Sequence, residues 1–152
     1  NVSIKKTYSS AIVNTKGRGW QGFEKIHTLN ETDQVLTTET YFQEWPLTSQ
    51  KRQVDTQTAD GKLLKSEKTA FEAVSVSKGP WKTYHANKTL EQTDMLEGGV
   101  VVRSNATLYA YDVDGNVTSQ SSSETVRGQV KFRSWQKCTY TTISGIKISL
   151  SG

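Results

Sequence analysis

The stretch VRSNATLYAYDVDGNVTS, residues 102–119, decides the fold. Its first half places Val102, Ser104, Ala106, Leu108 and Ala110 on one side and Arg103, Asn105, Thr107, Tyr109 and Tyr111 on the other. Strict alternation with period two predicts a β-strand. Asp114-Gly115 follows directly, and Asp-Gly between extended runs is typical of a two-residue hairpin turn, because both residues must adopt positive φ. The stretch therefore predicts an antiparallel hairpin.

The same pattern continues along the chain, which is rich in Thr, Val and aromatic residues and shows no helical spacing of apolar positions. We predict strands at 2–13, 20–29, 35–45, 50–57, 62–76, 81–86, 89–96, 102–111, 116–126, 130–137 and 139–150. In residues 130–137 the expected faces are Lys131, Arg133, Trp135 and Lys137 against Val130, Phe132, Ser134 and Gln136. The predicted fold class is all-β: antiparallel β-hairpin repeats that form a curved sheet or a sandwich-like wrap.

Four turn candidates recur with a spacing of 27 residues, and they begin at Asp33, Asp60, Asn87 and Asp114. An aliphatic residue follows each of them three positions later: Leu36, Leu63, Leu90 and Val117. This period predicts stacked hairpins, each of which buries its apolar face only through its neighbours.

Length and composition exclude several classes of protein. The chain has 152 residues and begins with Asn, and we interpret it as a single domain cut from a longer chain, 1–152. It lacks an apolar run long enough for a membrane span, and its single cysteine, Cys138, excludes an internal disulfide framework. His27 and His85 lie 58 residues apart without metal-ligand spacing, and no cofactor-binding glycine motif is present. We therefore expect no enzyme, no cofactor and no metal.

Charge is unevenly distributed. Residues 125–152 contain five Lys or Arg and no acid, so the rest of the chain sums to about −1 of the total +4. A basic segment can bind nucleic acid or an acidic surface, or it can be the wet face of a sheet. We favour the interpretation that these residues lie on a solvent-exposed face of the sheet, because no nucleic-acid-binding motif accompanies the charge. We therefore expect no nucleic-acid partner.

Four motifs carry a resemblance to a known family. Residues 17–25, GRGWQGFEK, resemble the glycine-arginine signature of the B component of bacterial insecticidal toxin complexes. Residues 42–48, FQEWPLT, and 58–64, TADGKLL, resemble the segments that follow it there. Residues 111–118, YDVDGNVT, are similar to the core of the YD repeats that define the Rhs family. The resemblance covers 15–126, whereas 127–152 is a stretch of divergent basic C-terminal strands.

The resemblance implies a structural role. Such chains coil a long antiparallel sheet into a hollow shell that encloses or presents a toxin. The chain would then form part of the wall of this shell. The whole protein would be secreted by a bacterium or held at its surface. Its partners would be neighbouring repeats of the parent chain, an enclosed toxin or another toxin-complex component. The residues that carry the repeat motifs are Gly17, Arg18, Gly19, Gly22, Phe23, Tyr111, Asp112, Gly115 and Asn116.

An alternative function is a carbohydrate- or cell-surface-binding β module that holds glycans on exposed rings. The candidate aromatics are Trp20, Trp45, Trp81, Trp135 and Tyr109. The competing interpretation, which we favour, is that these rings fill the core, because the chain has few large aliphatic residues. Finally, a sheet cut from a shell has open edges, so we expect a homodimer or another edge-to-edge association of the isolated chain.

Overall fold

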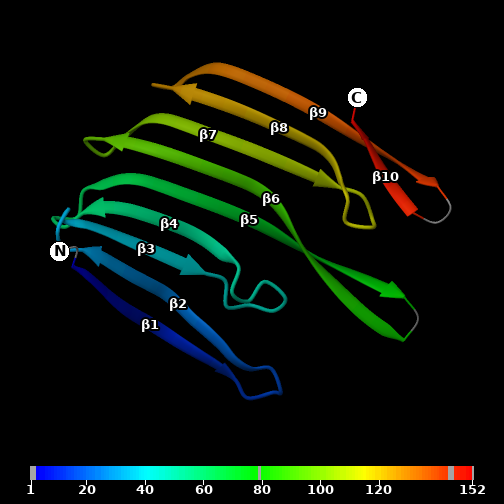
Figure 1. Cartoon of the computed structure of the whole chain (residues 1–152), viewed down its shortest axis with the longest axis horizontal. Coiled ribbons are helices and arrows are strands. Elements are labelled where there is room, and N and C mark those ends of the chain that lie inside the picture. The colour runs from blue at the N-terminus through cyan, green and yellow to red at the C-terminus, as the bar shows by residue number, and fades with distance from the viewer. Residues whose placement is uncertain (1–2, 79, 144–145, 152) are drawn as a thin grey trace.

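The computed structural model describes residues 3–78, 80–143 and 146–151, and its side chains over 3–76, 80 and 82–140. Its ten strands lie in one antiparallel sheet, in the order of the chain (Figure 1). The strands are β1 (Ile4–Asn14), β2 (Gly19–Asn30), β3 (Val35–Tyr41), β4 (Lys51–Thr58), β5 (Leu63–Lys78), β6 (Trp81–Glu97), β7 (Val100–Tyr111), β8 (Val117–Val126), β9 (Gln129–Ile143) and β10 (Ile146–Ser151). Within the described residues, no helix is long and apolar enough to cross a membrane.

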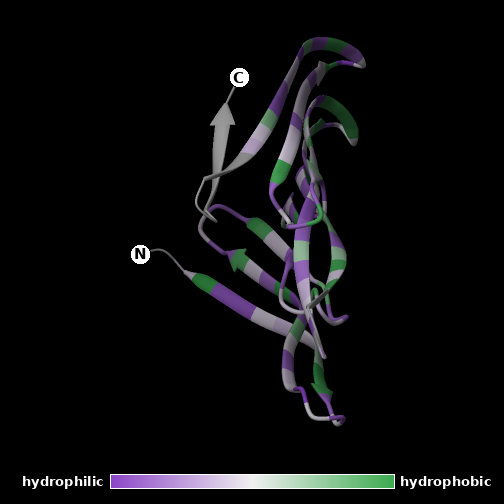
Figure 2. Cartoon of the chain, turned by 90° about the vertical axis from the view of Figure 1, so that its right-hand side faces the viewer, coloured by the Kyte–Doolittle hydropathy of each residue, from purple (hydrophilic) through white to green (hydrophobic). Residues whose placement is uncertain are grey.

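The sheet is an open meander. Each strand pairs with the next, and β1 and β10 lie at opposite ends of the order. Seen from the side, the strands form one curved layer (Figure 2). The predicted all-β antiparallel fold is confirmed in its curved-sheet form. A sandwich-like wrap was the wrong alternative, since the described strands belong to a single layer.

Strands β5 and β6 reach beyond their neighbours as a two-stranded ribbon (Figure 1). Residues 71–78 of β5 pair with 81–88 of β6, past the ends of their pairings with β4 and β7. The β3–β4 loop lies along one side of this ribbon, where the rings of Phe42 and Phe71 meet at 6.0 Å. The β7–β8 turn lies along the other side, where the Tyr111 hydroxyl donates to the Lys88 carbonyl at 2.7 Å. These two connections give the ribbon lateral contacts that it would otherwise lack.

No hydrophobic residue among those with described side chains is fully buried; the buried residues are the polar Gln21, Ser66, Asn87 and Asp94. The prediction that the aromatic rings fill a core was therefore wrong for Trp20, Trp45 and Trp135, which are 57, 51 and 67% exposed. The physical reason is the architecture, because a single layer has no second layer against which a large ring can be buried.

The predicted 27-residue period was also wrong. Asp33 and Asp60 do lie at hairpin turns of one end of the sheet, between β2 and β3 and between β4 and β5. Asn87, however, is buried inside β6, so the strands predicted at 81–86 and 89–96 are one strand. Asp114 lies in the β7–β8 turn at the opposite end. An Asx residue next to a lysine resembles a turn in sequence, but Asn87 is held in register opposite Glu72.

The alternation predicted for 130–137 holds from Phe132 onward. Val130 pairs with Thr125 and Phe132 with Glu124, so the pairing shifts by one residue between them. This β-bulge places Val130 and Phe132 on opposite faces, contrary to the prediction. Arg133, Trp135 and Lys137 share one face, as expected, since they oppose alternate residues of β8.

Candidate functional site

Two matching networks of polar side chains lie in the middle of the sheet. In the first, the Asp55 carboxylate accepts from Gln53 Nε2 at 2.8 Å and from Ser66 Oγ at 2.7 Å. In the second, the Asp94 carboxylate accepts from Gln92 Nε2 at 2.9 Å and from Ser104 Oγ at 2.6 Å. We call these the Asp55 network and the Asp94 network. Each ties a Gln-x-Asp segment of one strand to a serine of the next.

The two networks share one face of the sheet, which we call the carboxylate face. Residues that oppose one another in register lie on the same face. One such row runs from β3 to β7 through Thr38, Asp55, Ser66, Asp94 and Ser104. Ser66 and Asp94 retain only 5 and 7% of their exposure. Because every carboxylate in the row has hydrogen-bond donors, the row is suited to holding strand register rather than to proton transfer.

The sequence analysis missed these networks. The available signal was a repeated Gln-x-Asp tripeptide, beginning at Gln53 and at Gln92, each followed on the next strand by a serine. The 27-residue search concealed it, because the two glutamines lie 39 positions apart.

The opposite face carries the ion pairs, and we call it the ion-pair face. Glu39, Glu67 and Glu124 belong to one row of opposed residues on this face. They pair with Lys51, Lys65 and Arg103, respectively. A fourth pair joins Lys88 to Glu91. All of these side chains are partly exposed, which is the usual setting of surface ion pairs.

The Tyr-Asp motif builds the β7–β8 turn. Asp112 Oδ1 accepts hydrogen bonds from the backbone N–H groups of Asp114 at 3.0 Å and Asn116 at 2.9 Å. The Asn116 side chain donates to the same carboxylate, and Gly115 adopts φ +85°. Asp112, Gly115 and Asn116 therefore form the turn, as expected for Asx and Gly residues. Tyr111 anchors the turn to β6 through its hydroxyl, and Tyr140 makes an equivalent bond to the Val117 carbonyl at 2.7 Å.

The glycine-arginine motif builds the β1–β2 turn. Gly17, Gly19 and Gly22 all adopt positive φ, which a residue without Cβ permits at no steric cost. Arg18 places its guanidinium 4.6 Å from the centre of the Trp45 ring, in the β3–β4 loop. Phe23 packs against the rings of Tyr8 and Trp20 at 4.8 and 5.2 Å. The repeat-motif residues thus act in turns and ring contacts, and they are spread over two separate places in the sheet.

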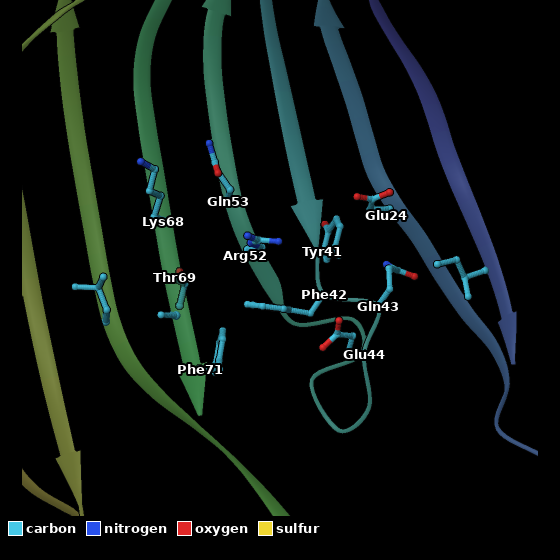
Figure 3. A pocket seen from close by; sticks show the side chains of 13 residues that line it. Glu24, Tyr41, Phe42, Gln43, Glu44, Arg52, Gln53, Lys68, Thr69 and Phe71 are labelled. Carbon is cyan, nitrogen blue, oxygen red and sulfur yellow. The ribbon is translucent and has the colours of Figure 1, made fainter. Parts of the chain in front are cut away.

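A hollow of about 860 Å³ lies where the β3–β4 loop borders the sheet (Figure 3). Phe42 and Phe71 contribute rings, and Arg52 lies 5.7 Å from the centre of the Phe42 ring. Charges of both signs line it, from Glu24, Glu44, Arg52 and Lys68. No His, Cys or Ser is among the lining residues, so a hydroxyl or thiol activated by histidine has no support there.

The candidate aromatics do not form a common platform. Trp20 lies in β2, Trp45 in the β3–β4 loop and Trp135 in β9, while the side chain of Trp81 lies outside the described residues. Trp45 meets the Tyr84 ring edge-on, at 6.2 Å and 75°. Tyr109 is half-buried, and its hydroxyl donates to Glu91 Oε2 at 2.8 Å. Burial, together with this bond, raises the pKa of Tyr109 to about 12.

Two other groups have pKa values that follow from their neighbours. The hydrogen bond from Lys88, with a further one from Tyr109, lowers the pKa of the Glu91 carboxyl. The hydrogen bond from Lys51 likewise lowers the pKa of Glu39. Both shifts are produced by structural ion pairs on the ion-pair face.

The histidines and the cysteine lie far apart in the fold. His27, in β2, forms a 3.0 Å hydrogen bond between its Nδ1 and Thr38 Oγ1, whereas His85 is exposed on the ribbon of β6. Cys138 is a free, partly exposed thiol in β9. Within the described part of the chain, no three His, Cys, Asp or Glu side chains are placed to hold a metal ion.

Comparison with known proteins gives one informative result. No family model and no curated protein matches the chain. Among solved structures, the chain is similar to part of the crystal structure of TcdB2-TccC3, a toxin-complex B/C component with an Rhs-like β-shell. The TM-score is 0.75 at 9% sequence identity, over 97% of this chain and 12% of that one. The likeness confirms the resemblance at the level of the fold, and this chain spans about an eighth of the protein it matches.

Proposed function

We propose that this chain is a structural segment of an exported Rhs/YD-repeat protein of the toxin-complex type, a piece of the wall of a β-shell that encloses or presents a toxin. The observation that carries the proposal is the fold match to TcdB2-TccC3 over 97% of the chain. In this role the chain forms part of the shell wall and supplies no catalytic group. The whole protein is secreted by a bacterium or lies on its surface.

The packing of the chain supports this role. Its sheet has one layer, its described side chains include no buried hydrophobic residue, and several large apolar side chains are more than half exposed. Exposed apolar side chains in such number are typical of a surface that other parts of an assembly cover. A segment of the wall of a larger shell would be covered in this way, because neighbouring strands of the shell continue the sheet at both of its edges.

The test compares the isolated chain with the full-length parent protein. Amide hydrogen exchange of β1 and of residues 129–137 in β9 should slow strongly in the parent, because added strands would pair with these edges. Strands β4 and β5, which have partners on both sides already, are the internal control. Equal exchange at the edges in both proteins would contradict the proposal.

A further inference from the structure

The hollow bordered by the β3–β4 loop is a groove that crosses the strands. Its lining residues come from the loop and from six successive strands, from Ile12 in β1 to Leu90 in β6. Because neighbouring strands lie about 4.8 Å apart, this span is about 24 Å, which is the length of about seven residues of extended chain. Lys68 lines the groove two residues after Ser66, so the groove opens on the carboxylate face.

Charges of opposite sign lie toward opposite sides of the groove (Figure 3). Glu24 of β2 and Glu44 of the loop lie toward one side. Arg52 of β4 and Lys68 of β5 lie toward the other. None of the four takes part in the ion pairs that the described residues form. This arrangement favours an occupant that carries a cation and an anion at separate places.

Two phenylalanine rings also line the groove. The rings of Phe42 and Phe71 meet edge to face, with 6.0 Å between their centres, and both are partly exposed. The Arg52 guanidinium lies 5.7 Å from the centre of the Phe42 ring. An apolar or aromatic side chain of an occupant can therefore pack against rings that already stand beside the cations.

One hydrogen-bond acceptor among the lining residues is unsatisfied. Gln43 Nε2 donates to the Phe23 carbonyl at 3.1 Å, whereas Gln43 Oε1 is buried and has no hydrogen-bond partner among the described residues. Buried acceptors in folded proteins are nearly always satisfied, so a donor is missing at this place. The backbone N–H groups of a peptide are donors of the required kind.

We propose that this groove binds an extended peptide segment of a polypeptide that is not part of the wall, with a basic, an apolar and an acidic side chain at alternate positions. Residues i, i+2 and i+4 of an extended chain point to the same side and span about 13 Å, close to the roughly 14 Å from β2 to β5. The basic residue then meets the two glutamates, the apolar residue meets the two rings, and the acidic residue meets the two cations.

The proposed function decides the source of the segment, and the inference rests on it. A shell built by coiling one sheet adds its further strands at the edges of that sheet. The faces of the sheet therefore border whatever lies inside or outside the wall. A groove on a face, in the middle of the strand order, is accordingly filled by another polypeptide and not by the next strand of the wall.

A second copy of this chain and a nucleic acid are poor occupants. All ten described strands pair in the sheet, and the longest described stretch outside them, residues 42–50, itself borders the groove. The described part of a second copy thus offers no unpaired extended segment of the required length. A nucleic acid would bring its phosphates close to Glu24 and Glu44, which repel them.

The test uses the 152-residue chain and three labelled, capped peptides. The first is Gly-Lys-Ser-Phe-Ser-Glu-Gly, and the second replaces its Phe with Ala. The third, Gly-Ser-Phe-Ser-Lys-Glu-Gly, has the composition of the first but adjacent charges. Fluorescence anisotropy should show the first peptide binding about tenfold more tightly than either of the others, because only the first carries a ring between two separated charges.

Charge reversal locates the site. The wild-type chain should prefer the first peptide to Gly-Lys-Ser-Phe-Ser-Lys-Gly, whereas the double variant Arg52→Glu and Lys68→Glu should prefer the two-lysine peptide about tenfold. The matched control, Lys62→Glu and Lys82→Glu, changes the net charge equally at exposed positions outside the groove and should keep the wild-type preference. The milder pair Arg52→Gln and Lys68→Gln should bind both peptides equally. Far-UV circular dichroism checks that every variant retains its strands.

Several outcomes would overturn the inference: no binding of the first peptide, equal binding of the first three peptides, or an unchanged preference after charge reversal. Self-association that Arg52→Gln and Lys68→Gln abolish would do the same, because a second copy would then fill the groove. So would protection of Lys68 from acylation in a parent shell assembled without the polypeptide that it encloses or presents, because the wall itself would then cover the groove.

None of these outcomes touches shell membership, which electron microscopy of the parent protein tests separately. A parent that forms no shell would remove the proposed function, and with it the assignment of the segment to a polypeptide outside the wall, even if the peptides bound as expected.

Discussion

The centre of the sheet and its edges are stabilised by different means. From β4 to β7 the strands are joined by the Asp55 and Asp94 networks, whose serines and aspartates have little or partial exposure and full sets of hydrogen-bond partners. At β1 and β9, by contrast, large apolar side chains such as Tyr8, Phe132 and Trp135 are more than half exposed to solvent. In most small domains apolar side chains are buried and polar side chains are exposed. In this sheet the buried side chains at the centre are polar, and large apolar side chains at the edges are exposed.

The difference follows from the single layer. Without a second layer, a sheet cannot bury a large apolar side chain, but a short polar side chain between two longer neighbours on the same face can be buried and satisfied. The centre can therefore be completed within the chain, whereas the edges can be completed only by added strands. Removing a hydrogen-bond partner at the centre should therefore lower the stability of the isolated chain strongly. Substituting an exposed side chain at the edges should change its stability little.

The largest effect is expected for Asp94→Ala. The change leaves the Ser104 hydroxyl and the Gln92 amide without their buried acceptor, which should lower the free energy of unfolding by about 2–3 kcal/mol. Urea denaturation followed by circular dichroism measures it. Glu97→Ala, an exposed carboxylate in the same strand, is the control and should change stability by less than about 0.5 kcal/mol. Equal losses for the two variants would show that the centre is not held by its network.

A smaller effect is expected for Tyr111→Phe. The substitution keeps the ring and removes only the 2.7 Å hydrogen bond to the Lys88 carbonyl, so the loss should be about 1 kcal/mol. Tyr8→Phe is the matched control, since Tyr8 is exposed on β1 at the edge of the sheet. If Tyr8→Phe costs as much as Tyr111→Phe, the anchoring of the β7–β8 turn to β6 contributes nothing measurable.

The sequence predicted the strands well, because period-two alternation and Asp-Gly turns are local properties. Asp114-Gly115 lies in a turn, as expected, but the predicted two-residue hairpin was wrong, because the loop spans residues 112–116 and, of the two, only Gly115 adopts positive φ, at +85°. Asn87 shows the limit of local signals: the same residue type can close a turn or sit buried in a strand, and only pairing with Glu72 decides. Trp135 shows another limit, because hydrophobicity predicts burial only where a second layer exists.

The polar networks could not be derived from the sequence for a related reason. Asp94 bonds to Ser104, ten residues away, and both residue types are more common on surfaces. Only the register of β6 with β7 brings them together on one face. The candidate site was therefore assigned to motifs and rings, whereas the buried side chains are small and polar.

The ion-pair face predicts an acid-dependent loss of stability. Hydrogen bonds from lysines lower the folded-state pKa values of Glu91 and Glu39 below 4.5, so their contribution is complete above about pH 4.5 and disappears as pH falls through the lowered values. The free energy of unfolding should fall over that window, and less steeply in the double variant Glu39→Gln and Glu91→Gln. High salt should flatten the curve, because these pairs are partly exposed. Identical pH profiles for wild type and variant would exclude the pairs as the cause.

The smallest effect on the isolated chain is expected for Trp135→Ser. The ring is 67% exposed on β9, so its removal forfeits little buried apolar area, and the free energy of unfolding should change by less than about 0.5 kcal/mol. In the full-length parent, where an added strand would cover the ring, the same substitution should cost at least about 1 kcal/mol more. Equal costs in the two settings would mean that β9 is an edge in the assembly too, and a large cost in the isolated chain would mean that the ring is buried there after all. A glycan array with the isolated chain tests the alternative role of this ring in sugar binding. If the chain binds a sugar and Trp135→Ser abolishes the binding, the exposed ring is part of a ligand-binding surface and not of an edge that another strand of the shell covers.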